Sequence, residues 1–126
     1  MNEHENKWAG LEGPGYHLEN LGRPAVFLLP SAKIEMQPQI EHGLRTFLTE
    51  NFGAFTVTVV PSFGVWKDAN HSVIDDSCLQ YEVSFAGKDR IPLLAKKLAE
   101  IAQDINEQCI YLKAGQYSCL VYPTTG

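Results

Sequence analysis

Two segments in which apolar and polar residues alternate, 55–60 and 77–85, restrict the possible folds of this chain most strongly. The apolar members are Phe55, Val57, Val59, Leu79, Tyr81, Val83 and Phe85, and the polar members are Thr56, Thr58, Gln80, Glu82 and Ser84. A period of two residues is typical of β-strands that turn one face to a hydrophobic core. We therefore predict a long β-hairpin whose polar face is either solvated or covered by a partner.

The residues before this hairpin predict a strand and a helix. The continuous apolar run 24–31 predicts a buried strand that is central in its sheet. A helix is predicted from Pro38 to residue 52, because proline suits a first turn and Gly53 suits a position just past a helix end. Its apolar face comprises Ile40, Leu44, Phe47 and Leu48. Gly43 costs this helix up to ~1 kcal/mol relative to alanine, which suggests that it packs closely against the sheet.

A second helix is predicted between Asp89 and Asn106, with Asp89 as N-cap and Pro92 in the first turn. Its apolar stripe comprises Ile91, Leu94, Ala95, Leu98, Ile101, Ala102 and Ile105. Residues 109–113 and 116–122 are strand-like. Between them, Ala114 and Gly115 predict either a tight turn or a glycine bulge.

The order is therefore strand, helix, strand, strand, helix, strand, and the last strand is open to division into two. Over residues 24–123 this order resembles the ferredoxin-like split β-α-β sandwich, an α+β fold whose antiparallel sheet carries two helices on one face. The resemblance implies a fold and no activity, because unrelated functions share this fold. Pro61 lacks a backbone N–H, so the strand before it is expected at an edge or a bulge.

Length and charge limit the class of protein. With 126 residues the chain fits a single α+β domain, which we assign to residues 24–126 after an N-terminal leader over residues 1–23. The leader has no periodicity, and its large apolar residues are expected to pack on its own domain or, the interpretation we prefer, across a partner. A net charge of −5 argues against a nucleic-acid-binding surface, which needs a basic stripe.

Three features bear on location. The polar start lacks the pattern of a signal peptide, and the apolar run 25–29 is much too short to span a bilayer. Cys78, Cys109 and Cys119 form no C-x-x-C pair, which fits a reducing compartment. We expect a cytoplasmic protein without a membrane partner.

The sequence holds none of the strong motifs for nucleotide, metal or covalent chemistry, and we expect no cofactor. The segment 68–76 contains three aspartates and one histidine, of which His71 and Asp75 are the candidate metal ligands. Aspartate and asparagine are also the residues that hairpin loops require. We therefore predict no metal site.

The polar face of the hairpin is the candidate functional site. If the apolar residues point to the helices, the opposite face carries Thr56, Thr58, Gln80, Glu82 and Ser84, with Trp66 near the strand end. Solvation is one interpretation, since antiparallel sheets often have one wet face. The other is that a second subunit or the leader covers this face and makes a polar cavity. In such a cavity Glu82 is desolvated and suited to act as acid, base or ligand anchor.

We predict a small soluble binding or accessory protein, a homodimer that uses the helix-free sheet face to dimerise or to hold a small polar ligand. One alternative is a cofactor-free enzyme with Glu82 as acid or base, in which Thr58, Gln80 and Trp66 shape the pocket. Another is a protein-interaction module that docks through its leader. We prefer the first because an enzyme usually presents two convergent titratable groups, and this face shows one.

Overall fold

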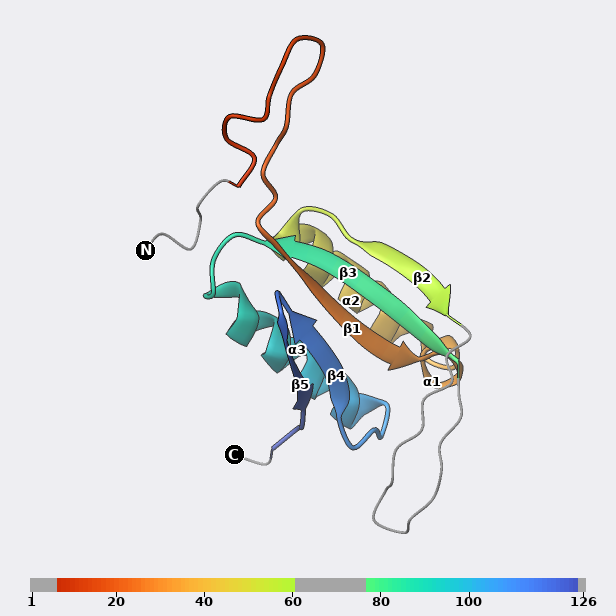
Figure 1. Ribbon diagram of the computed structural model, residues 1–126. Helices are drawn as coiled ribbons and strands as arrows, with labels where there is room; N and C mark the ends of the chain where they lie inside the picture. The colour runs from red at the N-terminus through yellow and green to blue at the C-terminus, as the bar shows by residue number, and fades with distance from the viewer. Residues whose placement is uncertain (1–6, 61–76, 125–126) are drawn as a thin grey trace.

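The computed structural model describes residues 7–60 and 77–124, in which antiparallel strands form one five-stranded sheet (Figure 1). The strands are β1 (Arg23–Pro30), β2 (Thr56–Val60), β3 (Cys78–Phe85), β4 (Ile110–Ala114) and β5 (Tyr117–Val121). Their order across the sheet is β2-β3-β1-β4-β5. The predicted hairpin is thus β2 and β3, the apolar strand β1 is central as predicted, and β2 lies at an edge as predicted.

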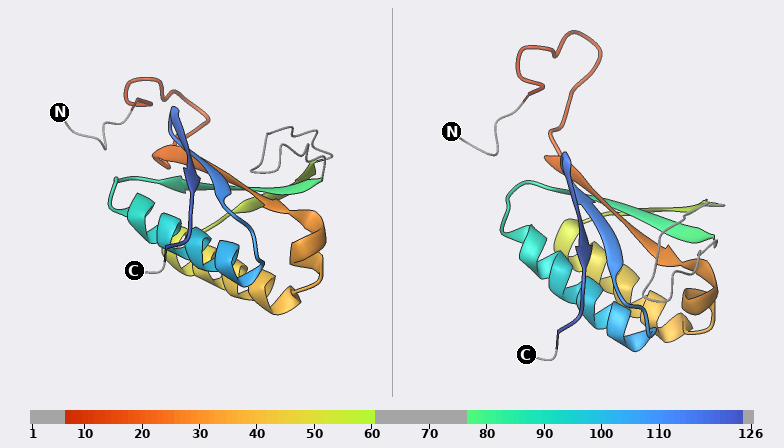
Figure 2. Two further views of the ribbon diagram at one scale, coloured as in Figure 1. Left: turned by 90° about the horizontal axis from the view of Figure 1, so that it is seen from below. Right: turned by 60° about the horizontal axis from the view of Figure 1, so that its bottom comes forward.

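The helices are α1 (Ser31–Glu35), α2 (Pro38–Phe52) and α3 (Arg90–Asp104). The two long helices lie side by side on one face of the sheet, and no helix of the described residues covers the other face (Figure 2). The ferredoxin-like arrangement predicted from the element order is therefore confirmed. The structure adds the five-residue α1, which is too short to show a helical period in the sequence.

The strand-like residues at the end of the chain form two strands. Ala114 pairs with Tyr117, so Gly115 and Gln116 make a two-residue turn between β4 and β5. Gly115 has φ +63°, a left-handed conformation that glycine adopts without steric cost. The tight turn is therefore the correct one of the two alternatives, and β5 extends the sheet beside β4.

The core lies between the sheet and the two long helices. Phe27 of β1 and Tyr81 of β3 are partners in the sheet register, and their rings stack with centroids 5.1 Å apart. Both side chains are completely buried. The predicted apolar stripe supplies the buried residues Leu94, Leu98, Ile101 and Ala102 of α3 and Ile105 directly after it.

The predictions made for three residues in or beside the helices can be compared with the structure. Gly53 follows α2 with φ +85°, as expected for a glycine that ends a helix. Asp89 is the N-cap residue of α3, but its side chain makes no capping hydrogen bond. The expected close packing of Gly43 is wrong, because a Cβ at this position would meet no atom within 4 Å.

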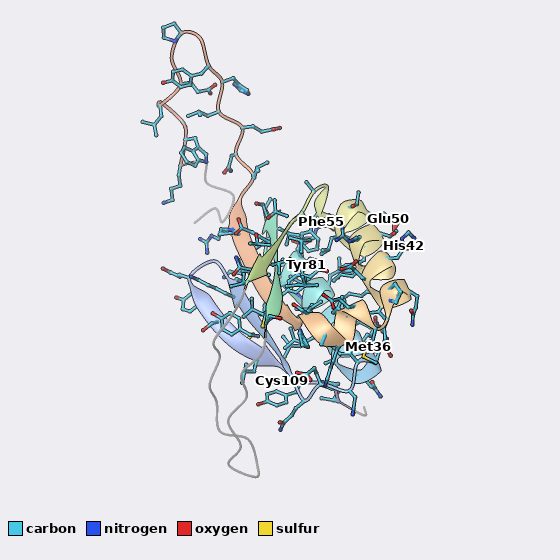
Figure 3. The ribbon with its side chains drawn as sticks, turned by 90° about the vertical axis from the view of Figure 1, so that its right-hand side faces the viewer. Met36, His42, Glu50, Phe55, Tyr81 and Cys109 are labelled. Atoms are coloured by element: carbon cyan, nitrogen blue, oxygen red, sulfur yellow. The ribbon has the colours of Figure 1, made fainter. Side chains whose placement is uncertain are left out.

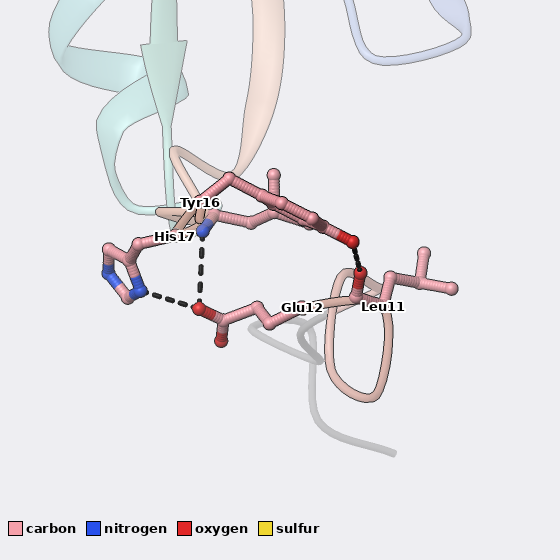
Figure 4. Close-up of polar contacts among 5 residues, drawn as sticks. Leu11, Glu12, Tyr16 and His17 are labelled. Atoms are coloured by element: carbon pink, nitrogen blue, oxygen red, sulfur yellow. Dashed lines mark hydrogen bonds and ion pairs between the residues drawn. The ribbon is translucent and has the colours of Figure 1, made fainter. Parts of the chain in front are cut away.

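Residues 7–22 project away from the sheet at one end of β1 (Figure 1). Within this segment Tyr16 donates a hydrogen bond of 2.6 Å to the carbonyl of Leu11, and Glu12 Oε2 lies 2.5 Å from His17 Nδ1 (Figure 4). Its exposed large apolar residues are Trp8, Leu11, Tyr16 and Leu21. The segment is therefore held in shape by its own polar contacts while its apolar side chains face outward.

In the described ranges, none of the helices combines the length and the apolar composition that crossing a membrane requires.

Candidate functional site

The residues predicted for the polar face do lie together on the face without helices. Thr56 of β2 and Val26 of β1 are the register partners of Glu82 on either side of β3. Thr58 and Leu28 flank Gln80 in the same way. Because residues in register point to the same side of a sheet, this face is polar over β2 and β3 and apolar over β1.

At one end of this face, β2 and β3 border a pocket of about 410 Å³. Its lining residues are Leu21, Phe52, Gly53, Ala54, Phe55, Thr56, Glu82, Val83 and Ser84. Three predicted site residues, Thr56, Glu82 and Ser84, therefore contribute to one cavity, whereas Thr58 and Gln80 lie further along the hairpin and do not line it. The pocket joins aromatic and aliphatic walls to two hydroxyls and one carboxylate.

Two glycines explain how residues distant in the sequence meet at this pocket, which we call the hairpin pocket. Gly53 accepts the φ of +85° that ends α2, and its N–H donates to the carbonyl of Thr49 at 3.0 Å. The chain then enters β2 at once, which places Phe52 and Phe55 at the pocket. Gly22, with φ +89°, lets the N-terminal segment cross the end of β3, which brings Leu21 to the same place.

Phe55 and Tyr81 lie near one another (Figure 3), and Phe55 also contacts a cluster of polar side chains from α2. Its ring packs against Tyr81 with centroids 6.4 Å apart, and the guanidinium of Arg45 lies 5.6 Å from the Phe55 ring centroid. Tyr81 donates a long hydrogen bond of 3.4 Å to Glu41, whose other oxygen lies 3.5 Å from Arg45 Nε. This cluster holds Phe55 between the pocket and the core.

Tyr81 is a proton donor in this cluster. Burial raises the pKa of Tyr81 to about 12, and the negative charge of Glu41 acts in the same direction. The phenol therefore keeps its proton at neutral pH and positions Glu41, rather than acting as a base itself.

The remaining predictions concern other parts of the chain. Trp66, His71 and Asp75 lie outside the described residues. Among residues 7–60 and 77–124 no three acidic, histidine or cysteine side chains gather as they would around a metal ion. Cys78, Cys109 and Cys119 are not joined in disulfides in the part of the chain that the structure describes.

The sequence does not reveal the apolar half of the hairpin pocket. The sequence places Leu21 in the leader, Phe52 in the predicted helix and Phe55 on the core face of the predicted hairpin. The available signal was Gly53, because a helix that ends on glycine directly before a strand brings the residues on both sides of that glycine to the strand end.

The fold and the site together define a small α+β sandwich of the ferredoxin-like type with a pocket of small-molecule size at the edge of its sheet. No protein-family model matches the sequence, and no curated protein matches it. Among solved structures, the fold is similar to that of a phage SAM lyase in complex with S-methyl-5′-thioadenosine, with a TM-score of 0.53 and 11% sequence identity over 86% of this chain and 96% of that chain. A phage SAM lyase in its apo state gives a TM-score of 0.49 and 10% identity over 88% of this chain and 99% of that chain. At these identities the likeness shows the fold alone.

Proposed function

We propose that this protein binds a small ligand in the hairpin pocket, and that the ligand combines a flat ring with hydroxyl groups, as a nucleoside does. The observation that carries this proposal is the composition of one cavity of about 410 Å³, in which Phe52 and Phe55 meet Thr56, Glu82 and Ser84. Small-molecule sites are typically cavities of this size with apolar walls and a few convergent polar groups.

The aromatic and polar side chains that line the pocket match the chemical groups of a nucleoside. An aromatic wall stacks on a purine or pyrimidine ring, as in nucleic-acid-binding proteins. The carboxylate of Glu82 is an acceptor for ribose hydroxyls, the role that an acidic residue has in dinucleotide-binding folds. The hydroxyls of Thr56 and Ser84 both donate and accept, so they suit the remaining polar atoms of a sugar or base.

The similarity in fold to a solved structure also supports the proposed ligand class. The similar phage SAM lyase structure contains S-methyl-5′-thioadenosine, so a ferredoxin-like sandwich of nearly the same length can hold a thioadenosine. That ligand has the ring and hydroxyl groups to which the hairpin pocket is suited. We therefore take S-methyl-5′-thioadenosine as the first ligand to test.

Isothermal titration calorimetry with S-methyl-5′-thioadenosine tests this proposal. We expect saturable binding, and we expect Glu82→Gln to weaken it by about tenfold or more, since a hydrogen bond to a charged group contributes roughly 1.5–3 kcal/mol. Glu100→Gln is the matched control, because Glu100 is an exposed carboxylate of α3 outside the pocket. Absence of binding, or an equal loss in both variants, would contradict the proposal.

A second candidate function is an enzyme that acts without a cofactor, with Glu82 as acid or base. It is favoured by the similarity in fold to a lyase. Incubation with S-adenosylmethionine, followed by chromatographic detection of S-methyl-5′-thioadenosine, tests it directly. An enzyme loses turnover in Glu82→Gln while the variant stays folded, whereas a binding protein forms no product in either form.

We further propose that residues 24–126 are the folded unit, that residues 1–23 are a leader, and that the protein is a cytoplasmic homodimer. The support for a dimer is the apolar part of the helix-free face, where Val26 and Leu28 are only half-buried although β1 is the central strand. An alternative is that the exposed leader residues Trp8 and Tyr16 dock on another protein. Native mass spectrometry of the purified chain distinguishes a dimer from a monomer.

A further inference from the structure

A second pocket, of about 380 Å³, lies on the other side of the point where the N-terminal segment meets the sheet. Its lining residues include Arg23, Phe85, Lys88, Ile91, Gln116 and Tyr117. It shares none of its lining residues with the hairpin pocket, from which it is separated by Gly22 and the end of β3. We call it the turn pocket, because the β4–β5 turn forms one of its walls.

Arg23 lines this pocket beside the β4–β5 turn. The side chain of Arg23 passes over Gly115, where its Cδ and Nη1 atoms lie 3.6 and 3.9 Å from the position that a Cβ would occupy. These are ordinary van der Waals distances, so it is the φ of +63° that requires glycine here, and Arg23 simply packs beside the turn. The side chain of Arg23 has neither a hydrogen bond nor an ion pair with any other residue in the described ranges. Its five N–H donors are therefore available to a ligand.

Lys88 adds a second positive charge to the same cavity. No acidic residue is among the lining residues, although the whole chain has a net charge of −5. The backbone N–H groups of Arg90 and Ile91, at the start of α3, donate to the carbonyls of Gly87 and Lys88. The side-chain donors considered for a ligand are therefore those of Arg23 and the amide of Gln116, and Lys88 contributes its positive charge to the cavity.

The remaining walls are apolar. Phe85 and Ile91 contribute apolar surface, and Tyr117 lies at the turn with its side chain 73% exposed. A cavity that combines two cationic side chains with aromatic surface is suited to an organic anion rather than to a bare ion.

We propose that the turn pocket binds an oxyanion, a carboxylate or a phosphate, that is attached to an aromatic or other apolar group. Arg23 forms a bidentate contact with the oxyanion, since the guanidinium fork matches two oxygens of either group. Lys88 neutralises the remaining charge, and the apolar group of the ligand lies against Phe85 and Tyr117. This site is independent of the hairpin pocket and of its proposed ligand.

The test uses the full chain and three probes that share one ring: benzoate, phenyl phosphate and benzyl alcohol. Binding is followed by two-dimensional ¹H–¹⁵N NMR, in which the amides of Gly87, Gly115 and Gln116 report on the pocket. We expect saturable shifts at these amides with an anionic probe and none with benzyl alcohol. Saturation by benzoate alone identifies a carboxylate site, and saturation by phenyl phosphate alone identifies a phosphate site.

Two variants test the named contacts. Arg23→Gln should weaken binding of the anionic probe by about tenfold or more, because a charge-assisted hydrogen bond is lost. Lys88→Gln should weaken it less, because lysine acts as a point charge. Lys96→Gln, an exposed change of α3 outside the pocket, is the control for net charge. The proposal would be overturned if the shifts failed to saturate or occurred equally with benzyl alcohol. It would also be overturned if Lys96→Gln weakened binding of the anionic probe as much as Arg23→Gln does.

Discussion

Gly22 lies so close to Phe85 that no side chain fits between them: an ideal Cβ at Gly22 would lie 2.1 Å from the carbonyl oxygen of Phe85. The contact involves the backbone of β3, so neither partner can rotate away. Leu21, on one side of this crossing, lines the hairpin pocket, and Arg23, on the other side, lines the turn pocket. One backbone contact therefore positions a wall of each cavity.

We expect Gly22→Ala to displace the N-terminal segment from β3 and to weaken ligand binding at both pockets. Alanine at φ +89° is strained by about 1–3 kcal/mol even before the overlap with Phe85 is counted. Gly10→Ala is the matched control, because Gly10 has a φ of +84° but its Cβ would meet no atom within 4 Å. Calorimetry and NMR titration of both variants measure the effect. An equal loss of ligand affinity in both variants would show that backbone strain alone causes the effect and that the contact with Phe85 does not.

Gly43→Ala should stabilise the protein by up to about 1 kcal/mol. Gly43 lies inside α2, where glycine is less favourable than alanine, and space for a Cβ is open. Chemical denaturation measures the change in unfolding free energy. Destabilisation would mean that Gly43 does pack closely against a neighbour, as its position in the sequence predicts.

The sequence predicts the sheet well because its signals are local. The alternation from Leu79 to Phe85 indicates which side of β3 is buried, and the continuous apolar run 24–31 indicates that β1 is central. The same alternation places Thr56, Glu82 and Ser84 on one face.

What the sequence does not reveal are contacts that the fold makes between distant segments. Leu21 reaches the hairpin pocket only because Gly22 crosses Phe85, and residues 7–22 have no periodicity that foretells this crossing. For Gly43 the sequence suggests a close contact that the fold does not make. A glycine in a helix shows that no side chain is present, but it does not show whether a neighbour needs that space. The turn pocket was missed for the same reason as Leu21, since Arg23 and Lys88 are far apart in the sequence.

The pKa of Tyr81 predicts a loss of stability at alkaline pH. Because the folded state raises this pKa from 10 to about 12, the native protein retains a proton that the unfolded chain releases between these pH values. The contribution is complete below pH 10 and is lost as pH rises towards 12, a change of about 2–3 kcal/mol. Denaturation at a series of alkaline pH values measures this slope, which Tyr81→Phe should reduce. The exposed change Tyr117→Phe is the control, and an unchanged slope in Tyr81→Phe would contradict the assignment.

Leu28→Lys tests whether the apolar part of the helix-free face joins two copies. Leu28 is half-buried at the middle of β1 and lies in register with Gln80, so a lysine there can extend into solvent in a monomer. In a dimer that buries this face, two unpaired charges would be desolvated, and we expect dissociation to increase at least tenfold. Analytical ultracentrifugation over a range of concentrations measures the dissociation constant. Glu100→Lys, an exposed change on α3, controls for charge. A wild-type chain that stays monomeric throughout that range would exclude the dimer, and a dimer that Leu28→Lys leaves intact would place the interface elsewhere, with the exposed N-terminal segment next to be tested.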